Sequence, residues 1–346
     1  MSLKLQKICN RIQILSTNQC KMSKFVALDQ RTSTKQSMGN LLEINNVVKN
    51  YGDYTALNNV SLHVPKGSVF GLLGPNGAGK TSLIRIINQI TMPDSGNVLL
   101  DGEELQPKHV EYIGYLPEER GLYKSMKVGE QCMYLAQLKG LDKKEAKERL
   151  KYWFEKFDIY SWWNKKVQEL SKGMAQKVQF IVTVMHRPKL LIFDEPFSGF
   201  DPINAQLIAK EILQLRDEGA TIIFSTHRME SVEELCDYIG LIDKSNLILE
   251  GKLDDIKRQF RSNTFQVGLE TSNIKEVEAK LRENFDVSEA DFKLLNEGLK
   301  LNVKLRNGST ANDLLSFLTK EGQVQHFVEL VPDANDIFIQ AVKKNS

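Results

Sequence analysis

The hydrophobic pattern of this chain becomes regular after about residue 40. Residues 41–51 and 55–64 alternate apolar and polar positions around a turn at 52–54, which is typical of two half-buried strands. Three short runs further along are largely apolar, at 69–73, 189–194 and 220–226. Runs of this kind predict strands that are buried on both faces of a parallel sheet. Two more strands are predicted at 97–100 and at the start of 112–123.

Helical spacing of apolar residues alternates with these strands. Residues 83–90 and 175–185 each show an amphipathic helical pattern. A further helix carries an aromatic and aliphatic stripe, which we interpret as core rather than as a cofactor site, at Ala146, Leu150, Trp153, Phe154 and Phe157. Alternating buried strands and helices predict an α/β fold with a largely parallel sheet.

The pattern changes again after about residue 254. We expect strands at 265–269, 292–295, 299–305 and 323–330, helices at 274–285 and 311–318, and a closing helix from residue 333. This alternation predicts a small α+β, ferredoxin-like domain. No group of acids, histidines or glycines in it suggests catalysis, so we expect regulation or a dimer contact.

The charge of the chain is unevenly distributed. The formal net charge is +2, but seven Lys or Arg and one Asp give residues 1–40 a charge of +6, which leaves −4 for the remainder. We expect this polar, basic leader to be disordered. Regular patterning begins close after Met38, so we hypothesise that Met22 or Met38 is the natural start. The remainder has no basic excess, and composition therefore predicts no nucleic-acid partner.

Cysteine spacing and hydropathy narrow the class of protein further. The four cysteines form no C-x-x-C pair, which argues against a disulfide scaffold or a zinc site. No apolar run approaches the roughly 18 residues that a membrane-spanning helix needs. A role at a membrane would therefore require a partner that supplies the spanning part.

A glycine-rich turn lies between the strand at 69–73 and the helix that follows it. Gly74, Gly79, Lys80 and Thr81 satisfy G-x-x-x-x-G-K-[ST], the phosphate-binding loop. Its glycines let several backbone N–H groups and a helix N-terminus point at the phosphates of a nucleotide. Lys80 adds a positive charge for the outer phosphates, and the Thr81 hydroxyl is a ligand for Mg²⁺. We expect nucleotide binding by this loop and its neighbours, Gly74, Pro75, Asn76, Gly77, Ala78, Gly79, Lys80, Thr81 and Ser82.

Titratable residues follow the other two buried strands. Asp194 ends the run at 189–194 and Glu195 follows it directly, and His227 follows the run at 220–226. Ligands in open parallel sheets bind at the carboxyl ends of the strands, so we expect Asp194 close to a Mg²⁺ on Thr81 and Glu195 nearer the γ-phosphate. Ser171 precedes a helix, where it is either a simple cap or a second place for an anion.

With these segments in this order, residues 41–255 resemble the ATP-binding subunit of ABC transporters. The resemblance implies a P-loop NTPase core with an antiparallel β subdomain and a helical subdomain, followed by the ferredoxin-like domain at 256–346. Family motifs assign Glu195 as the general base, His227 as the holder of the γ-phosphate and water, and Asp194 as the residue that positions Mg²⁺. They also assign Tyr51 to stacking on adenine.

The same resemblance implies two subunits that close head-to-tail on two ATP molecules. The segment 170–174 resembles the family signature, whose Ser171 and Gly173 reach the γ-phosphate held by the opposite subunit. Asp201 corresponds to the acid at the dimer contact. The expected cofactors are ATP and Mg²⁺, and the expected partners are a second copy of the chain and an integral membrane permease. The expected location is the cytoplasmic face of the cell membrane.

Two segments depart from the commonest family pattern. Glu118 replaces the usual Gln, and we expect it among the ligands of Mg²⁺, where its charge would raise the pKa values of the nearby acids or draw the metal closer. Lys172 and Met174 replace Gly and Gln of the signature. Both variants are similar to two-component exporters of the bacterial sodium-export type, a branch that also has a C-terminal extension.

Two functions remain to be compared. The first is an ATPase subunit that drives export of a small solute or ion through a separately encoded permease. The alternative is a soluble ABC ATPase that acts on a ribosome or nucleic-acid complex. Proteins of that class usually carry two ATP modules or long coiled-coil insertions, and this sequence shows neither.

Overall fold

The structure is a computed structural model that describes residues 39–118, 121–293, 298–306 and 308–345. Residues 1–38 lie outside this range, and with them nearly all of the predicted leader. In the described part of the chain no helix has the length and apolar character needed to cross a membrane.

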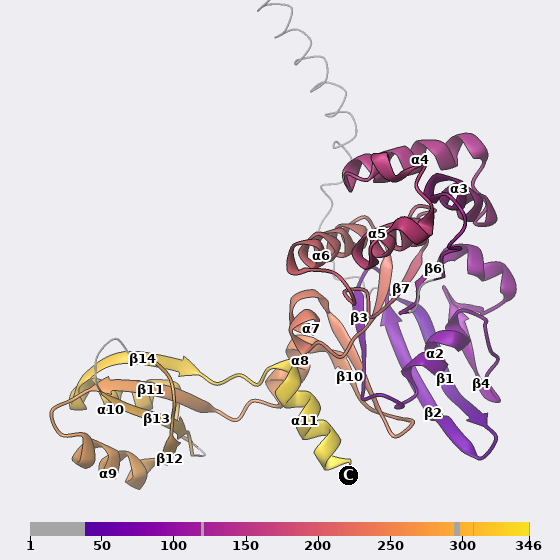
Figure 1. The fold of residues 1–346 in the computed structure, drawn as a ribbon. Coiled ribbons are helices and arrows are strands. Elements are labelled where there is room, and N and C mark those ends of the chain that lie inside the picture. Colours follow the sequence, from indigo (N-terminus) through magenta and orange to yellow (C-terminus); the bar gives the residue numbers. More distant parts are fainter. Residues whose placement is uncertain (1–38, 119–120, 294–297, 307, 346) are drawn as a thin grey trace, which may run out of the picture. The chain divides into compact units, whose positions relative to one another are not determined.

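A six-stranded sheet forms the centre of the fold (Figure 1). Its order is β10-β9-β3-β8-β7-β6, with parallel pairing from β9 to β6 and an antiparallel partner, β10, at one edge. The strands are β3 (Val69–Leu73), β6 (Ile113–Leu116), β7 (Leu190–Asp194), β8 (Thr221–Ser225), β9 (Tyr238–Asp243) and β10 (Asn246–Lys252). Every residue of β3, β7 and β8 is buried, so the prediction of strands covered on both faces is confirmed.

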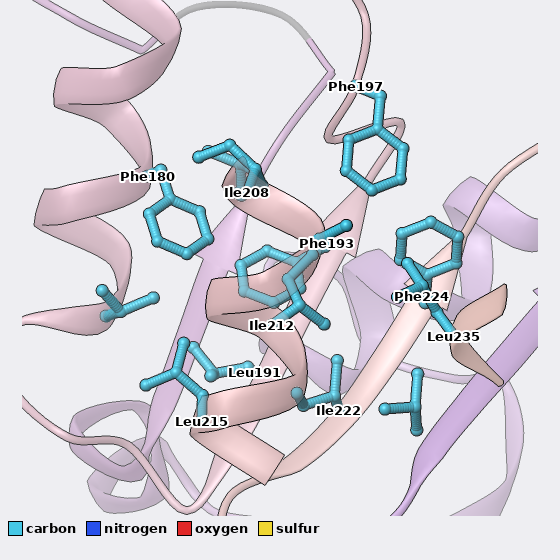
Figure 2. Packing of buried hydrophobic residues seen from close by; sticks show 14 of the residues in the cluster. Phe180, Leu191, Phe193, Phe197, Ile208, Ile212, Leu215, Ile222, Phe224 and Leu235 are labelled. Carbon is cyan, nitrogen blue, oxygen red and sulfur yellow. The ribbon is translucent and has the colours of Figure 1, made fainter. Parts of the chain in front are cut away.

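Alternate residues of these strands supply two hydrophobic cores, one on each face of the sheet. Leu191 and Phe193 of β7 face one core, whereas Leu190 and Ile192 face the other. Figure 2 shows the first core, where the helix α6 (Pro202–Asp217) lies across β7 and β8. The Phe180 ring of α5 (Lys172–Val184) stacks on the Phe193 ring with centroids 5.6 Å apart. The period of two along each strand therefore attaches helices to both faces.

Helices alternate with many of these strands. They are α2 (Lys80–Ile87), α3 (Val128–Leu138), α4 (Lys143–Lys156), α5 (Lys172–Val184), α6 (Pro202–Asp217), α7 (Met229–Leu235) and α8 (Leu253–Gln259), with 3-10 turns at η1 (Pro107–Tyr112), η2 (Tyr160–Trp162) and η3 (Val167–Glu169). The aromatic stripe of α4 is buried, which confirms its interpretation as core. Sequence analysis identified α2, α4 and α5 but not α3, α6, α7 or α8.

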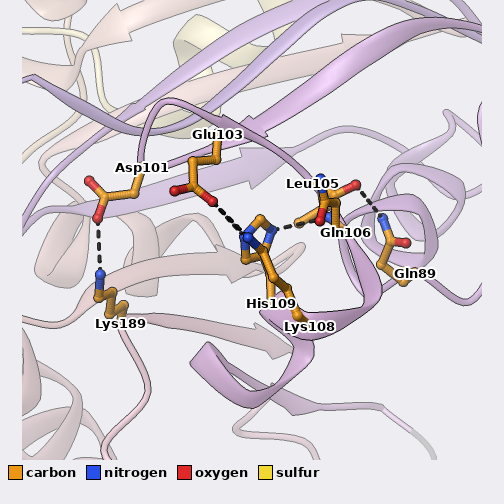
Figure 3. A network of polar contacts seen from close by, with 8 residues as sticks. All are labelled: Gln89, Asp101, Glu103, Leu105, Gln106, Lys108, His109 and Lys189. Carbon is orange, nitrogen blue, oxygen red and sulfur yellow. Dashed lines mark hydrogen bonds and ion pairs between the residues drawn. The ribbon is translucent and has the colours of Figure 1, made fainter.

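A second, antiparallel sheet covers the opposite core. Its order is β2-β1-β4-β5, formed by β1 (Asn40–Tyr51), β2 (Tyr54–Pro65), β4 (Ser95–Leu100) and β5 (Glu103–Glu104). Side chains near β5 form the polar network of Figure 3. Glu103 pairs with Lys108 at 3.0 Å and with His109 at 3.4 Å, and Lys189 reaches Asp101 at 3.0 Å. The last pair links this sheet to the residue before β7.

The C-terminal region contains a third sheet, with β11 (Thr264–Glu270), β12 (Asp286–Glu289), β13 (Leu299–Lys304) and β14 (Gln323–Glu329). Its order β12-β13-β11-β14, with α9 (Ile274–Asn284) and α10 (Ala311–Glu321) between strands, is the expected ferredoxin-like topology. The strand predicted at 292–295 is wrong: residues 291–293 are not a strand, 294–297 lie outside the described residues, and the second strand is β12. A cross-strand partner for β13 follows α9 directly, and the local pattern did not reveal it.

The last helix, α11 (Ala334–Lys344), belongs to the first core of the central sheet. Ala334, Ile337 and Ala341 are buried there, and Phe338 packs against them. The closing helix predicted from residue 333 is therefore confirmed, and the surface that its apolar face covers is that of the N-terminal region.

Candidate functional site

The glycine-rich loop joins β3 to α2, and steric limits explain two of its glycines. Gly79 precedes α2 with φ 117°, and a Cβ there would lie 2.3 Å from the Ala56 carbonyl oxygen. Gly74 has φ 148°, and its Cβ would lie 2.2 Å from the Ile242 carbonyl oxygen. Only glycine allows this positive φ together with so close an approach of neighbouring backbone. The loop therefore leaves the backbone N–H groups at the start of α2 available to bind an anion.

Lys80 lies against this loop. Its Nζ donates to the Gly74 carbonyl at 2.6 Å and to the Pro75 carbonyl at 3.0 Å. Partial burial lowers the pKa of Lys80, and the nearby Asp194 and Glu195 carboxylates oppose that effect. The ammonium group is therefore placed where it can exchange neutral carbonyl partners for the charged oxygens of a nucleotide.

A cavity of about 290 Å³ brings the loop together with the acids predicted from the strand ends. Its walls come from residues that are far apart in sequence, because β3, β7 and β8 are neighbours in the central sheet. The lining residues are Tyr54, Ala56, Asn76, Gly77, Ala78, Gly79, Lys80, Thr81, Ser82, Glu118, Asp194, Glu195, Ser225 and His227. The predicted convergence of three strand ends on one site is thus seen in the geometry.

Asp194 is the most buried carboxylate of the cavity, with 8% of its surface exposed. Burial raises its pKa, and the negative charges of Glu118 and Glu195 act in the same direction. A hydrogen bond from Ser225 and the charge of Lys80 oppose the shift. A cation bound beside Asp194 would relieve both the desolvation and the repulsion between the carboxylates.

Glu195 is held by a network from β8 and the residues after it. Its Oε1 accepts a hydrogen bond from the His227 backbone N–H at 2.9 Å, and Oε2 accepts one from the Thr226 hydroxyl at 3.2 Å. The His227 ring nitrogen Nδ1 lies 2.7 Å from Oε1. Glu195 also has φ 49°, an uncommon value for a residue with a side chain. Strain of this kind persists where the surroundings determine the geometry, as they do at many active sites.

The oxygen donors of the cavity suit a hard divalent cation. Thr81, Asp194 and Glu118 all line it. Over the described part of the chain, no group of three or more His, Cys, Asp or Glu side chains has metal-binding geometry. One or two carboxylates with water and phosphate oxygens are what Mg²⁺ takes in nucleotide sites, so the donor set fits that ion better than zinc or calcium.

The remaining predicted residues do not line this cavity. Tyr51 ends β1 and is 44% exposed, with Lys49 Nζ 5.5 Å from its ring centroid. Ser171 caps α5 through the Met174 N–H at 3.3 Å, and Asp201 caps α6 through the Asn204 N–H at 3.0 Å. Gly173 lies beside Ser171 in the first turn of α5. The capping alternative for Ser171 is present, and its role toward a second nucleotide stays a prediction.

Sequence analysis missed Tyr54 as a cavity residue. Its hydroxyl donates to the Gly77 carbonyl at 2.8 Å, which connects the antiparallel sheet to the glycine-rich loop. The signal was present in the hairpin: a two-residue turn at Gly52 and Asp53 makes Tyr54 the direct partner of Tyr51. The predicted turn at 52–54 included Tyr54, so the pairing of Tyr51 with Tyr54 was not predicted.

Comparison with known proteins agrees with this geometry. Residues 57–198 match the family described as ABC transporter, and residues 251–342 match the family described as ATP-binding protein DrrA1-3-like, C-terminal domain. An uncharacterized ABC transporter ATP-binding protein of Bacillus subtilis, YhaQ, is 40% identical over 304 residues, which are 87% of this chain and 98% of that protein.

A second relative and a solved structure extend the comparison. The linearmycin resistance ATP-binding protein LnrL of Bacillus subtilis is 36% identical over 68% of this chain and 76% of its own length. A solved ATP-binding subunit of an ABC transporter superposes with a TM-score of 0.60 at 30% identity, over 64% of this chain and 93% of that chain.

Proposed function

Because this chain belongs to the ABC transporter family as an ATP-binding protein, we propose that it powers export of a small solute or ion through a separately encoded membrane permease. Members of this family are ATPases. The observation that carries the proposal is the single cavity that holds Lys80, Thr81, Asp194, Glu195 and His227. The match of residues 251–342 to a domain found in other ATP-binding proteins supports it.

Nucleotide binding is assigned to the loop and its neighbours. The backbone N–H groups of residues 74–82 would surround the phosphates, and Lys80 would move from the loop carbonyls to the outer phosphates. Tyr51 would stack on the adenine at the edge of the antiparallel sheet. Mg²⁺, held by Thr81 and Asp194 with help from Glu118, would supply positive charge beside the transferred phosphoryl group.

Hydrolysis is assigned to Glu195 and His227. The Glu195 carboxylate would accept hydrogen bonds from the attacking water and orient it, as a general base requires. His227 would contact the γ-phosphate and that water, and its 2.7 Å contact with Glu195 orients the ring. Ser225 and His227 therefore both contribute to the wall of the cavity, and the His227 side chain is exposed to solvent.

We assign Ser171, Gly173 and Asp201, which do not line the cavity of their own subunit, to the nucleotide of a second copy. Ser171 caps α5 and Gly173 lies in its first turn, where the helix N-terminus favours an anion. Asp201 begins α6. In a head-to-tail homodimer these residues would complete the partner's site, so turnover would need two chains.

The same family membership supports a peripheral location on the cytoplasmic face of the cell membrane. We assign residues 41–255 to the ATP-binding domain and residues 256–346 to the accessory domain, with residues 1–40 as a leader. The last helix, α11, falls in the sequence range of the accessory domain, although its buried residues lie in the first core. Nucleic acid has no place in this proposal.

The test is Mg²⁺-dependent ATP hydrolysis by the full chain, measured against protein concentration. We expect a rate that rises with the square of concentration at low protein and falls to background without Mg²⁺. We also expect the chain to co-purify with a permease encoded beside it. A rate linear in concentration, with the protein on ribosomes rather than membranes, would instead favour the soluble ABC ATPase.

A further inference from the structure

The histidine of the cavity is followed at once by a short helix. His227 lies between β8 and α7, which is only seven residues long and has no side-chain cap at its start. Upstream, the His227 backbone N–H is held by the Glu195 carboxylate at 2.9 Å. Downstream, its position depends on where α7 lies. A helix of two turns has little stability of its own, so its neighbours must hold it.

The C-terminal helix α11 is one of those neighbours. Val232 and Leu235 of α7 belong to the same buried cluster as Ala334, Ile337 and Ala341 of α11. Apolar contact therefore joins the buried face of α7 to a helix that lies about 100 residues later in the chain. Apolar burial is not directional, so it does not determine the distance between the first residues of α7 and α11.

Open space separates the beginnings of the two helices. A cavity of about 620 Å³ is lined by His227 and the start of α7 on one side and by residues 333–335 on the other. Close packing is absent on this side of α7. A polar contact across the cavity edge must then determine how far the first turn of α7 lies from α11.

Glu233 makes that contact. Its Oε1 accepts a hydrogen bond from the Ala334 backbone N–H at 2.6 Å, and its Oε2 pairs with Lys257 Nζ of α8. The Glu233 and Lys257 side chains are 28% and 24% exposed, so solvent screens the pair only partly. Ala334 is the first residue of α11, where the helix dipole favours a carboxylate. One side chain thus ties three helices together.

We propose that Glu233 is a positioning residue for ATP hydrolysis, which holds α7 against α11 and so sets the place of His227 in the cavity. The inference rests on the proposed role of His227. It makes the C-terminal segment part of the support of the ATPase site. A misplacement of about 1 Å in a reacting group is enough to lower turnover by one to two orders of magnitude.

The experiment removes each end of the contact in the full chain. Glu233→Ala deletes the acceptor, and Ala334→Pro deletes the donor. Proline is accepted at a first helical position, and Asp333 has the extended backbone (ψ 173°) that a residue before proline needs. Glu234→Ala, at an exposed neighbour on α7, is the matched control.

We expect kcat to fall about tenfold in Glu233→Ala and in Ala334→Pro, with KM for ATP within twofold of the wild type. The double variant should be no slower than either single one, because both remove the same contact. The thermal midpoint of each variant checks that the chain folds, and Glu234→Ala should match the wild type.

Two results would overturn the inference. One is a kcat of Glu233→Ala equal to that of Glu234→Ala in an active wild-type background, which would leave the proposed function intact. The other is a loss confined to KM, because that would show an effect on nucleotide binding rather than on the position of His227. A wild-type chain that hydrolyses no ATP would overturn both this inference and the proposed function.

Discussion

The Oε1 atom of Glu195 lies 2.7 Å from Nδ1 of His227 and accepts the backbone N–H of the same histidine at 2.9 Å. These two contacts fix a carboxylate and an imidazole relative to each other at the ends of neighbouring parallel strands. The arrangement holds both groups in a fixed geometry at the wall of the cavity. Preorganisation of this kind saves the cost of reorganising polar groups during the reaction.

Replacement of the carboxylate tests its chemical role. Glu195→Gln keeps an oxygen that can accept the His227 N–H but removes the basic group, so we predict that turnover falls by roughly 10²-fold to 10⁴-fold. ATP affinity should be retained, because Lys80 and the loop are unchanged. Steady-state hydrolysis and binding of a fluorescent ATP analogue check the two parts. Turnover within threefold of the wild type would remove Glu195 from its assigned role.

Two glycines of the phosphate loop should respond differently to a methyl group. In Gly79→Ala the new Cβ meets the Ala56 carbonyl oxygen at 2.3 Å and φ is 117°, whereas Gly77, with φ 79°, has no atom within 4 Å of a Cβ. We predict a loss of about 3 kcal/mol or more in unfolding free energy for Gly79→Ala and about 1 kcal/mol for Gly77→Ala. Urea unfolding without nucleotide measures both. Equal losses would contradict the steric argument.

The lowered pKa of His186 predicts how the free energy of unfolding depends on pH. Burial, with the positive charge of Lys139 nearby, lowers the pKa of His186 from 6.5 to about 4. The unfolded chain therefore binds a proton at His186 more tightly than the folded chain does. The neutral ring therefore contributes to the free energy of unfolding in full above pH 6.5. This contribution, at most about 3 kcal/mol, is lost as the pH falls toward 4.

Unfolding curves between pH 7 and pH 4 check that prediction. His186→Gln removes the titrating group, so the unfolding free energy of this variant should fall less steeply over the interval than that of the wild type. Parallel curves for the two proteins would show that the ring is not the source of the pH dependence.

Glu118 allows a test of metal binding. It lines the cavity beside Thr81 and Asp194, and its charge helps to raise the pKa of Asp194. We predict that Glu118→Gln weakens Mn²⁺ binding to the nucleotide-free protein about tenfold. The Mn²⁺ concentration that gives half-maximal ATP hydrolysis should rise by about the same factor. Electron paramagnetic resonance of free Mn²⁺ measures the first quantity. Glu111→Gln, at an exposed carboxylate that does not line this cavity, is the control. Identical affinities in wild type and Glu118→Gln would exclude Glu118 as a ligand.

Much of the site was predictable because its signals are local. A phosphate loop needs particular residue types at positions close together in the sequence. An acid that directly follows a buried strand lies at the carboxyl edge of a parallel sheet, whichever position that strand has in the order of the sheet. Glu195 and His227 were found in this way. Tyr54 was not, because its contact with Gly77 depends on how the hairpin of β1 and β2 lies over the loop.

The amino-acid sequence by itself determined the class of the core, the loop that binds phosphate and the residues at the three strand ends, because periodicity and short motifs encode backbone geometry directly. Only the tertiary structure decided which surfaces meet. The sequence predicted a closing helix from residue 333, but not that this helix packs on α7 beside His227. Apolar burial favours any partner of suitable shape, so the contact between Glu233 and Ala334, which lie 101 residues apart, follows from the folded packing alone.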